Sequence, residues 1–406
     1  MLTLLYPDLI PIIQEMPAGI LSINVEDKAC PMFIVKAPKE YILAAKINAG
    51  FKIYLAPVQI DNQRTFGFVT AFFDDEDEPL VIRTPLFADD FARILLDSLR
   101  NGQINVHFFD ELAREQLVYR AEVTIPDVTQ KKINKLSLLK PSRPNARVII
   151  DEMSEWFSLR TSCDDNEAIN VFFSELTFGE TLFIQDMRPE RHAYHGSRGH
   201  SHTFLEREEA GRYQEEDVIN CLLLIFEADK IYHSPKRVYD GEEICDILVV
   251  TDSKLLIIQT KDSPNTERIS RQSLSRKRSN VLRALKKAIN QVKGAVGYCQ
   301  RIKDKLEFVI NGNQYSIDTS GLEVMALVVV KELFNNQYIE YSELLLDLFE
   351  DKAVPCIALD YPELYLFCVH LRNEDSFFAA FNTLLAHAVT HGSYPRLRFG
   401  LGEKIL

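Results

Sequence analysis

Three polar side chains interrupt two otherwise apolar runs between residues 240 and 261, which read DGEEICDILVVTDSKLLIIQTK. They are Asp246, Gln259 and Lys261. A carboxylate and an amide oxygen are hard ligands for a divalent metal ion, and a lysine beside them can neutralise developing negative charge. Burying such groups costs roughly several kcal/mol unless they are paired or bound to something. The simplest alternative to a metal site is a buried salt bridge between Asp246 and Lys261 in an ordinary sheet.

The two apolar runs predict the strands that position these residues. Both runs are rich in Val, Ile and Leu, as strands buried on both faces are. The tetrapeptide TDSK between them is turn-like, so we expect an antiparallel hairpin. If Val250 faces Leu255 across the turn, Asp246 faces Gln259, because paired residues in a regular antiparallel ladder keep a constant index sum. Lys261 then lies on the same face as Gln259, two residues further along the strand.

This pattern resembles the PD-(D/E)xK nuclease superfamily, the restriction-endonuclease-like fold, and within it the Mrr-like and NERD-like branch. Asp246 matches the family's acidic residue, Gln259 its D/E/Q position and Lys261 its lysine. Gln259 departs from the commoner carboxylate at that position and removes a charge from the expected site. The resemblance covers roughly residues 205–335, about a third of the chain.

A helix before the first strand often supplies a second acid in these branches. The segment YQEEDVINCLLLIF is similar and offers Glu215 or, one residue out of register, Glu216. The resemblance therefore implies an endonuclease, a phosphodiester hydrolase that uses Mg²⁺ or Mn²⁺. Its implied metal ligands are Asp246, the Gln259 amide oxygen, the Thr260 backbone carbonyl and Glu215, and its catalytic residues are Asp246, Gln259, Lys261 and Glu215. The implied substrate is DNA, and the implied setting is bacterial antiviral defence or restriction.

A strongly basic stretch follows Lys261, although the whole chain carries a net charge of −13. Between residues 261 and 305 there are 13 basic and three acidic residues, a local balance of +10. Such a stripe is typical of a surface that binds the phosphate backbone. The residues expected to contact nucleic acid are Arg276, Lys277, Arg278, Lys286, Lys287 and Gln291. The alternative is a solvated helix face followed by a flexible basic loop.

The pattern of apolar runs divides the chain into four parts. Residues 1–135 contain seven strand-like runs and one helix, at 89–99, which predicts an α+β domain of recognition or regulatory type. Residues 136–204 are expected to be a connector. Residues 205–335 predict an α/β nuclease-like core with a mixed sheet and the element order αβββαβ, in which the helix near 279–300 crosses between parallel strands. Residues 336–406 predict an α/β extension packed on the core.

Within the connector, the sequence predicts short helices and a histidine-rich loop. Asp164, Asp165 and Asn166 precede the run AINVFFSEL and are interpreted as possible caps of a helix there. Residues 187–203 carry four of the nine histidines, His192, His195, His200 and His202. Their spacing suits zinc, but no cysteine or carboxylate stands at ligand spacing, so a mobile loop is the preferred interpretation.

Composition and length set the remaining bounds. A chain of 406 residues with 46% hydrophobic residues is long enough for two or three domains with their own cores. Its seven cysteines are scattered and contain no C-x-x-C, which predicts reduced thiols in a cytoplasmic protein, and no apolar run suggests a membrane span. Two other functions stay open: a catalytically weakened nuclease fold that binds nucleic acid as a module, and a protein-interaction scaffold. Besides DNA, a second copy of the chain or a defence-system protein is an open partner.

Overall fold

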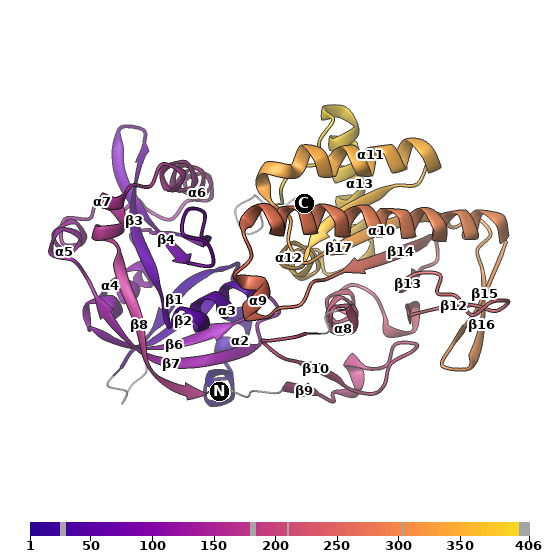
Figure 1. Cartoon of the computed structure of the whole chain (residues 1–406), viewed down its shortest axis with the longest axis horizontal. Coiled ribbons are helices and arrows are strands. Elements are labelled where there is room, and N and C mark those ends of the chain that lie inside the picture. The colour runs from indigo at the N-terminus through magenta and orange to yellow at the C-terminus, as the bar shows by residue number, and fades with distance from the viewer. Residues whose placement is uncertain (25–29, 179–183, 209–210, 303, 398–406) are drawn as a thin grey trace.

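The structure is a computed structural model, and it describes residues 1–24, 30–178, 184–208, 211–302 and 304–397. Two large sheets lie side by side, one built from the first half of the chain and one from the second half (Figure 1). The chain is thus a mixed α and β protein. None of the helices in the described ranges is long and apolar enough to cross a lipid bilayer.

The N-terminal sheet has eight strands in the order β1-β2-β6-β7-β8-β3-β4-β5. All neighbours in it are antiparallel except β2 and β6. Seven strands and the helix α4 occur where the sequence predicted them. Their bounds are β1 Gly19–Ile23, β2 Met32–Lys36, β3 Gly50–Ile60, β4 Gln63–Phe72, β5 Leu80–Pro85, α4 Asp90–Arg100, β6 Gln103–Phe109 and β7 Glu115–Thr124.

The eighth strand, β8 (Ile169–Phe178), comes from the segment expected to be a connector. It pairs with β7 on one side and with β3 on the other, so this sheet extends past the boundary expected at residue 135. The predicted helix at AINVFFSEL is therefore wrong. The cap belongs to the preceding helix α7 (Ser162–Glu167), where Thr161 and Asp164 form a capping box. The β-branched and aromatic residues of the run instead fit a strand.

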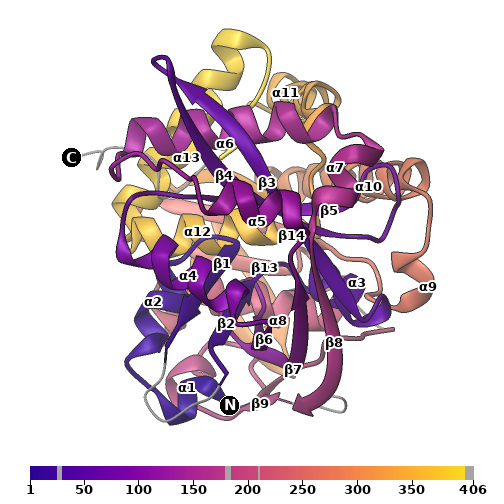
Figure 2. The same ribbon diagram turned by 90° about the vertical axis from the view of Figure 1, so that its left-hand side faces the viewer.

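The other N-terminal helices surround this sheet. Helix α6 lies across β3, β4 and β5 (Figure 2), and buries Ile149 and Met153 against them. Gly67 of β4 permits this close packing, because a Cβ there would lie 2.2 Å from the sulfur of Met153. The bounds of these helices are α1 Leu2–Leu5, α2 Leu9–Glu15, α3 Lys39–Ile47, α5 Asp127–Ile133 and α6 Arg143–Ser158.

The second sheet has five strands in the order β11-β13-β14-β17-β18. β11 (Ile231–His233), β13 (Ile247–Val250) and β14 (Lys254–Lys261) pair antiparallel, whereas β14, β17 (Glu323–Val330) and β18 (Cys356–Asp360) pair parallel. With α8 (Gly211–Leu222) before them and α10 (Leu274–Ile302) between β14 and β17, the first four strands of this sheet and the two helices follow the order αβββαβ. Further short elements at residues 236–237, 267–270, 305–310 and 313–318 lie between them in the chain. β11 is an edge strand, as Pro235 beside it suggested.

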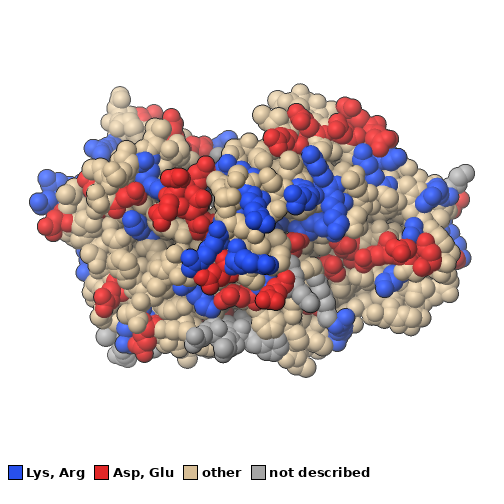
Figure 3. All heavy atoms as spheres, viewed as in Figure 1, with Lys and Arg blue, Asp and Glu red and all other residues tan. Residues whose placement is uncertain are grey.

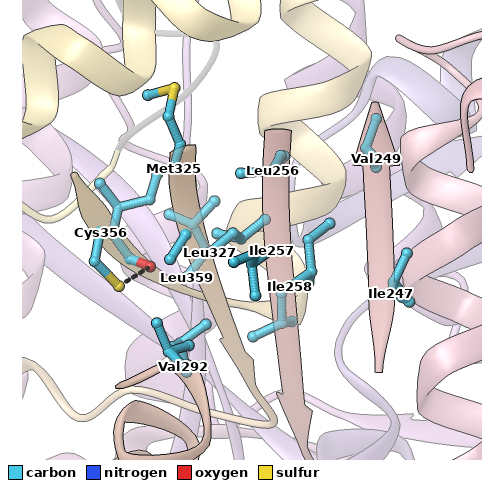
Figure 4. Close-up of a cluster of buried hydrophobic side chains, with 14 of the residues drawn as sticks. Ile247, Val249, Leu256, Ile257, Ile258, Val292, Met325, Leu327, Cys356 and Leu359 are labelled. Carbon is cyan, nitrogen blue, oxygen red and sulfur yellow. Dashed lines mark hydrogen bonds between the residues drawn. The ribbon is translucent and has the colours of Figure 1, made fainter. Parts of the chain in front are cut away.

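Helix α10 holds the core together from one side. Its buried residues include Leu285, Ile289, Val292 and Val296, as the 3,4 spacing predicted, and they pack against β14 and β17. Figure 4 shows Val292 together with strand residues such as Ile257 and Leu327 in one apolar cluster. The strands are buried along nearly their whole length, which explains their unbroken Val, Ile and Leu content.

The C-terminal residues up to 397 extend the core, and within that range they do not form a separate sheet. β18 adds a fifth strand parallel to β17, and three helices pack beside it. These helices are α11 Tyr338–Lys352, α12 Tyr361–Leu371 and α13 Glu374–His391. The remaining short elements are β9 Ile184–Asp186, β10 Ser201–Thr203, β12 Lys236–Arg237, α9 Glu267–Ser270, β15 Lys305–Ile310, β16 Asn313–Asp318 and three single-turn 3₁₀ helices at 189–191, 228–230 and 335–337.

Ion pairs connect the two halves of the molecule. Asp217 of α8 accepts from Lys39 at 3.2 Å and from Arg114 at 2.6 and 3.0 Å, and all three groups are largely shielded from water. Lys331, after β17, lies 2.9 Å from Glu40 of α3. Because each pair joins an N-terminal residue to a core residue, the two sheets are fixed to each other through α8 and through the end of β17.

Candidate metal and nucleic-acid site

The hairpin formed by β13 and β14 has the register that the sequence predicted. Val250 pairs with Leu255 and Ile247 pairs with Ile258. Asp246 immediately precedes β13 and therefore lies opposite Gln259. The expectation that these two residues face each other across the hairpin is confirmed, and Lys261 ends β14 on the same side.

The Asp246 carboxylate is buried and accepts hydrogen bonds from β14. Its Oδ2 accepts from the Thr260 backbone N–H at 2.6 Å, from the Thr260 hydroxyl at 2.9 Å and from the Lys261 ammonium at 3.5 Å. Burial raises the pKa of Asp246 above its ordinary value, and the charge of Lys261 and the Thr260 N–H only partly offset that rise. A cation placed beside this carboxylate would stabilise its charged form.

The amide of Gln259 is only 2% exposed and faces the same carboxylate. With its nitrogen turned toward Asp246 it donates to Oδ1 at 3.0 Å and to Oδ2 at 3.1 Å. With its oxygen turned there, acceptors face acceptors, and a cation is needed between them. A separation of about 3 Å is the distance between adjacent ligands of an octahedral ion whose oxygen ligands are about 2.1 Å away. The donor set of Asp246 and Gln259 therefore fits Mg²⁺ in one amide orientation.

Lys261 and the Thr260 carbonyl are in direct contact. The ammonium of Lys261 donates to the Thr260 carbonyl oxygen at 2.7 Å, so the atom expected to ligate metal serves here as an acceptor for lysine. The side chain of Lys261 is 19% exposed, compared with 7% for that of Asp246. Lys261 is thus the more accessible of the two, and the role of the Thr260 carbonyl as a ligand stays a prediction.

Of the two acids proposed from α8, the geometry favours Glu215. Glu215 shares a hydrogen bond of 2.7 Å with His233 of β11, and its negative charge contributes to raising the pKa of Asp246. Glu216, one residue later, is 5% exposed. Asp217 faces the N-terminal half of the molecule. Because an α-helix has 3.6 residues per turn, the consecutive side chains of residues 215, 216 and 217 point in different directions.

Glu243 is an acid near this site that the sequence did not single out. Partial burial raises the pKa of Glu243, and the charges of Asp246 and Glu215 add to the rise. It follows an exposed turn and lacks a strand or helix period, so its sequence carried no signal. Among the described residues, no three His, Cys, Asp or Glu side chains are arranged to hold a metal ion. A metal here would thus use few carboxylates, together with the Gln259 oxygen and water, as Mg²⁺ often does.

No protein-family model and no curated protein sequence matches this chain. The assignment of the site therefore depends on its own residues.

The basic stripe of α10 divides into paired and unpaired residues. Figure 3 shows Lys and Arg side chains gathered over this helix. Near its start, Lys277 forms an ion pair with Asp74, and Arg278 lies 2.7 Å from Glu78. Both acids belong to the run Asp74–Glu78, which consists entirely of Asp and Glu. Two residues expected to bind phosphate thus contact carboxylates of the N-terminal unit.

The other predicted contacts lie open to solvent. Arg276, Lys286, Lys287 and Gln291 are exposed on α10, and no ion pair is recorded for the three basic ones within the described ranges. Lys303, also in the basic stretch, lies outside the described residues. The exposed residues can bind phosphate without first breaking another contact.

The histidine-rich segment packs on the core in its middle. His195 exchanges backbone hydrogen bonds with Ile231 and His233 at 3.0 and 2.9 Å, and its ring stacks on Tyr232. At Gly196, which has φ +93°, a Cβ would lie 2.8 Å from the His233 carbonyl oxygen. These contacts anchor residues 195–196, in contrast to the mobile loop that the sequence favoured. They also place the segment next to β11, whose His233 bonds Glu215.

Proposed function

We propose that this protein is a Mg²⁺-dependent endonuclease that hydrolyses DNA, with a restriction-endonuclease-like core, and that it acts in bacterial defence. The observation that carries the proposal is the hairpin register, which brings Asp246, Gln259 and Lys261 together beside Glu215 of α8. An ordinary buried salt bridge would explain Asp246 and Lys261. It would not require a second acid, whereas the charge of Glu215 also acts on the Asp246 carboxylate.

In this proposal the residues share the work as follows. Asp246, the Gln259 amide oxygen, the Thr260 carbonyl and Glu215 would hold the metal ion. When bound, Mg²⁺ supplies positive charge to the phosphate and lowers the pKa of a bound water. Lys261, whose ammonium lies 3.5 Å from the Asp246 carboxylate, would neutralise negative charge that develops on a phosphate bound at this site. His233 positions the Glu215 carboxylate through their hydrogen bond.

The exposed basic residues of α10 account for substrate binding. Helix α10 begins shortly after Lys261 and contacts β14, so the stripe and the candidate metal site belong to one continuous part of the chain. Arg276, Lys286 and Lys287 offer charges that phosphates can contact without reading sequence. Gln291, on the same helix, is exposed and can donate a hydrogen bond to the phosphate backbone of DNA.

A second candidate function, a nuclease fold that binds DNA without cutting it, is favoured by one observation. With the amide nitrogen of Gln259 turned inward, Asp246 is saturated by donors from Gln259 and Thr260 and needs no metal. This module would bind DNA equally well in EDTA and in Mg²⁺. A protein-interaction scaffold would bind DNA in neither condition.

Nicking of supercoiled plasmid in Mg²⁺ tests the proposal. We expect cleavage by the natural protein and loss of cleavage, by about 10²-fold or more, in Asp246→Asn and in Lys261→Ala. Asp252→Asn, an exposed carboxylate in the turn of the same hairpin, is the matched control and should remain active. Circular dichroism must show that each variant is folded. Full activity of a folded Asp246→Asn protein would rule out the nuclease assignment, and DNA retention in EDTA without cleavage would establish the binding module.

A further inference from the structure

The turn that follows β12 carries an exposed aromatic side chain with no role in the candidate metal site. Residues 236–243 read KRVYDGEE, and Val238 and Tyr239 stand at the tip of the turn. Tyr239 is 68% exposed and Val238 is 47% exposed. Because folding leaves most of their surface in water, neither side chain adds much apolar burial to the fold. Both are therefore available to a ligand.

Arg237 holds this tip in place. Its guanidinium lies 5.3 Å from the ring centre of Tyr239 and 5.8 Å from that of Tyr298 on α10. The same guanidinium donates through Nε to Oδ1 of Asp240 at 3.0 Å, and its Nη2 lies 2.9 Å from Oδ2. Gly241, at φ +73°, closes the turn by donating its N–H to the Arg237 carbonyl at 3.0 Å. A tyrosine held in this way loses little conformational entropy when it binds a flat ring.

The tip lies close to the candidate metal site. Lys236 and Glu243 form a β-bridge at the base of the turn, and the charge of Asp246 acts on Glu243. The four residues from Tyr239 to Glu243 can span at most about 14 Å. Figure 1 shows β12 beside the C-terminal end of α10, where the rings of Tyr239 and Tyr298 lie 6.3 Å apart between centres. A strand bound at Asp246 would therefore reach Tyr239 within a few nucleotides.

One face of α10 connects the tip to the exposed cations. Lys287 and Tyr298 are eleven residues apart, which is about three turns of helix and about 16 Å. They therefore lie on the same side of α10, and the exposed residues Gln291 and Gly294 lie between them. A Cβ at Gly294 would have no atom within 4 Å, so this part of the face is open.

The charges along this face suit a nucleic acid strand that presents a base, and not a phosphate, to the tip. Residues 236–243 carry two basic and three acidic side chains, so the turn itself does not attract phosphate. The exposed cations are Lys286 and Lys287 on α10. Cations combined with an aromatic ring that stacks on bases are typical of proteins that bind single strands. In a duplex the neighbouring base pairs cover the faces of each base, so only an unpaired base offers a free face to Tyr239.

We propose that Tyr239 stacks on an unpaired base near the cleaved phosphate, while Lys286 and Lys287 contact phosphates of the same strand. This inference rests on the proposed nuclease function and names its substrate class: single-stranded DNA, or the single-stranded part of a branched DNA. A partner protein that covered the apolar tip would not need the cations on α10, and DNA binding would then not depend on Tyr239.

Binding of oligonucleotides to the full-length protein in EDTA, measured by fluorescence anisotropy, tests the stacking without any cleavage. The probes are a labelled single strand, a duplex of the same length and a fully abasic strand of the same length. Tyr239→Ala should weaken binding of the single strand by about tenfold and leave binding of the duplex unchanged. Tyr239→Phe keeps the ring and should bind like the natural protein. Phe91→Ala is the matched control, because Phe91 is a 60% exposed aromatic residue of α4, and circular dichroism checks that each variant is folded.

The abasic strand identifies the base as the group that Tyr239 contacts. It should bind the natural protein more weakly than the intact strand does, and Tyr239→Ala should not weaken its binding further. Unchanged binding of the intact single strand by Tyr239→Ala, or equal losses for single strand, duplex and abasic strand, would overturn the proposal. The nuclease assignment fails separately: a protein that binds the single strand through Tyr239 but cuts no DNA in Mg²⁺ would keep the stacking contact and lose the cleavage.

Discussion

Gln259 is the residue on which the proposed metal site depends most. Its amide is buried beside Asp246 and can present either a donor or an acceptor to it. The donor orientation makes a metal-free cluster in which every oxygen of Asp246 is satisfied. The acceptor orientation makes a ligand pair that needs a cation. In our proposal, the same side chain serves a metal-free state in one amide orientation and a metal-bound state in the other.

Substitution of Gln259 distinguishes these roles. Gln259→Glu places a second carboxylate beside Asp246, so we expect a lower melting temperature in EDTA and a larger rise on addition of Mg²⁺ than in the natural protein. Gln259→Leu deletes the oxygen and should raise the Mg²⁺ concentration needed for half-maximal cleavage. Melting curves and cleavage rates over a Mg²⁺ titration check both. Three superimposable titrations would show that Gln259 is not a ligand.

The raised pKa of Asp246 predicts a pH dependence of metal binding. Only the deprotonated carboxylate binds metal, so Mg²⁺ affinity should fall as the pH drops through the Asp246 pKa, which burial places above 3.8. Lys261 lowers that pKa. In Lys261→Met we therefore expect the loss of Mn²⁺ binding to occur at a higher pH than in the natural protein. Titration of bound Mn²⁺ against pH measures this shift, and a shift in the opposite direction would mean that Lys261 does not act on Asp246.

At the scale of single elements, much of the hairpin was predictable and the contacts of α10 were not. The hairpin register follows from chain-local information, since a short turn between two apolar runs fixes every pair. The buried face of α10 follows from the 3,4 spacing of apolar residues in the helix itself. Strand β8 was mistaken for a helix because acidic capping residues precede it, and those residues cap the short helix α7 instead. The partners of Lys277 and Arg278 lie about 200 residues away, and no local pattern indicates them.

Those partners lead to a prediction for DNA binding. Asp74 and Glu78 hold Lys277 and Arg278, so they compete with phosphates for the same cations. We expect the double variant Asp74→Asn, Glu78→Gln to bind duplex DNA more tightly. The matched control is Glu76→Gln, Asp77→Asn, which removes the same charge from exposed positions in the same run. Salt titrations should also steepen by roughly 0.9 in log K per log salt for each cation released to phosphate. Equal affinities for the two double variants would show that only net charge matters.

At the scale of the whole molecule, buried charge concentrates where the two halves meet. Besides the pairs around Asp217, a cavity of about 160 Å³ lies between the ends of β14 and β17 and the N-terminal unit. Glu40, Asp262 and Glu332 line it, together with Lys331. Burial, and then the charges of Glu40 and Asp360, raise the pKa of Glu332 from 4.5 to about 8. We therefore expect the stability of this junction to depend on pH.

Glu332 makes the stability of the junction fall as pH rises. The pKa of Glu332 is higher in the folded than in the unfolded protein, so folding takes up a proton between pH 4.5 and about 8. Within this window the free energy of unfolding therefore decreases as the pH rises. We expect Glu332→Gln to match the natural protein near pH 5 and to be more stable above pH 8. The size of the pKa shift limits the gain in stability of the Glu332→Gln protein above pH 8 to about 5 kcal/mol. We expect a gain of roughly 1–2 kcal/mol, because water reaches part of the Glu332 side chain.

Urea unfolding at the two pH values measures this difference. Glu350→Gln, an exposed residue of α11, is the control and should show no such pH dependence. If the difference in stability between the Glu332→Gln protein and the natural protein were the same at both pH values, Glu332 would ionise normally.

The central claim is that the end of the β13–β14 hairpin holds a divalent metal ion. A crystal of the full-length protein soaked in Mn²⁺ tests it most directly, because the anomalous signal locates the ion without reference to activity. We predict a peak within coordinating distance of the Asp246 carboxylate, with the Gln259 amide oxygen turned toward it and Glu215 on its other side. A well-diffracting Mn²⁺-soaked crystal with no peak at Asp246, and with the Gln259 nitrogen still bonded to that carboxylate, would contradict the account.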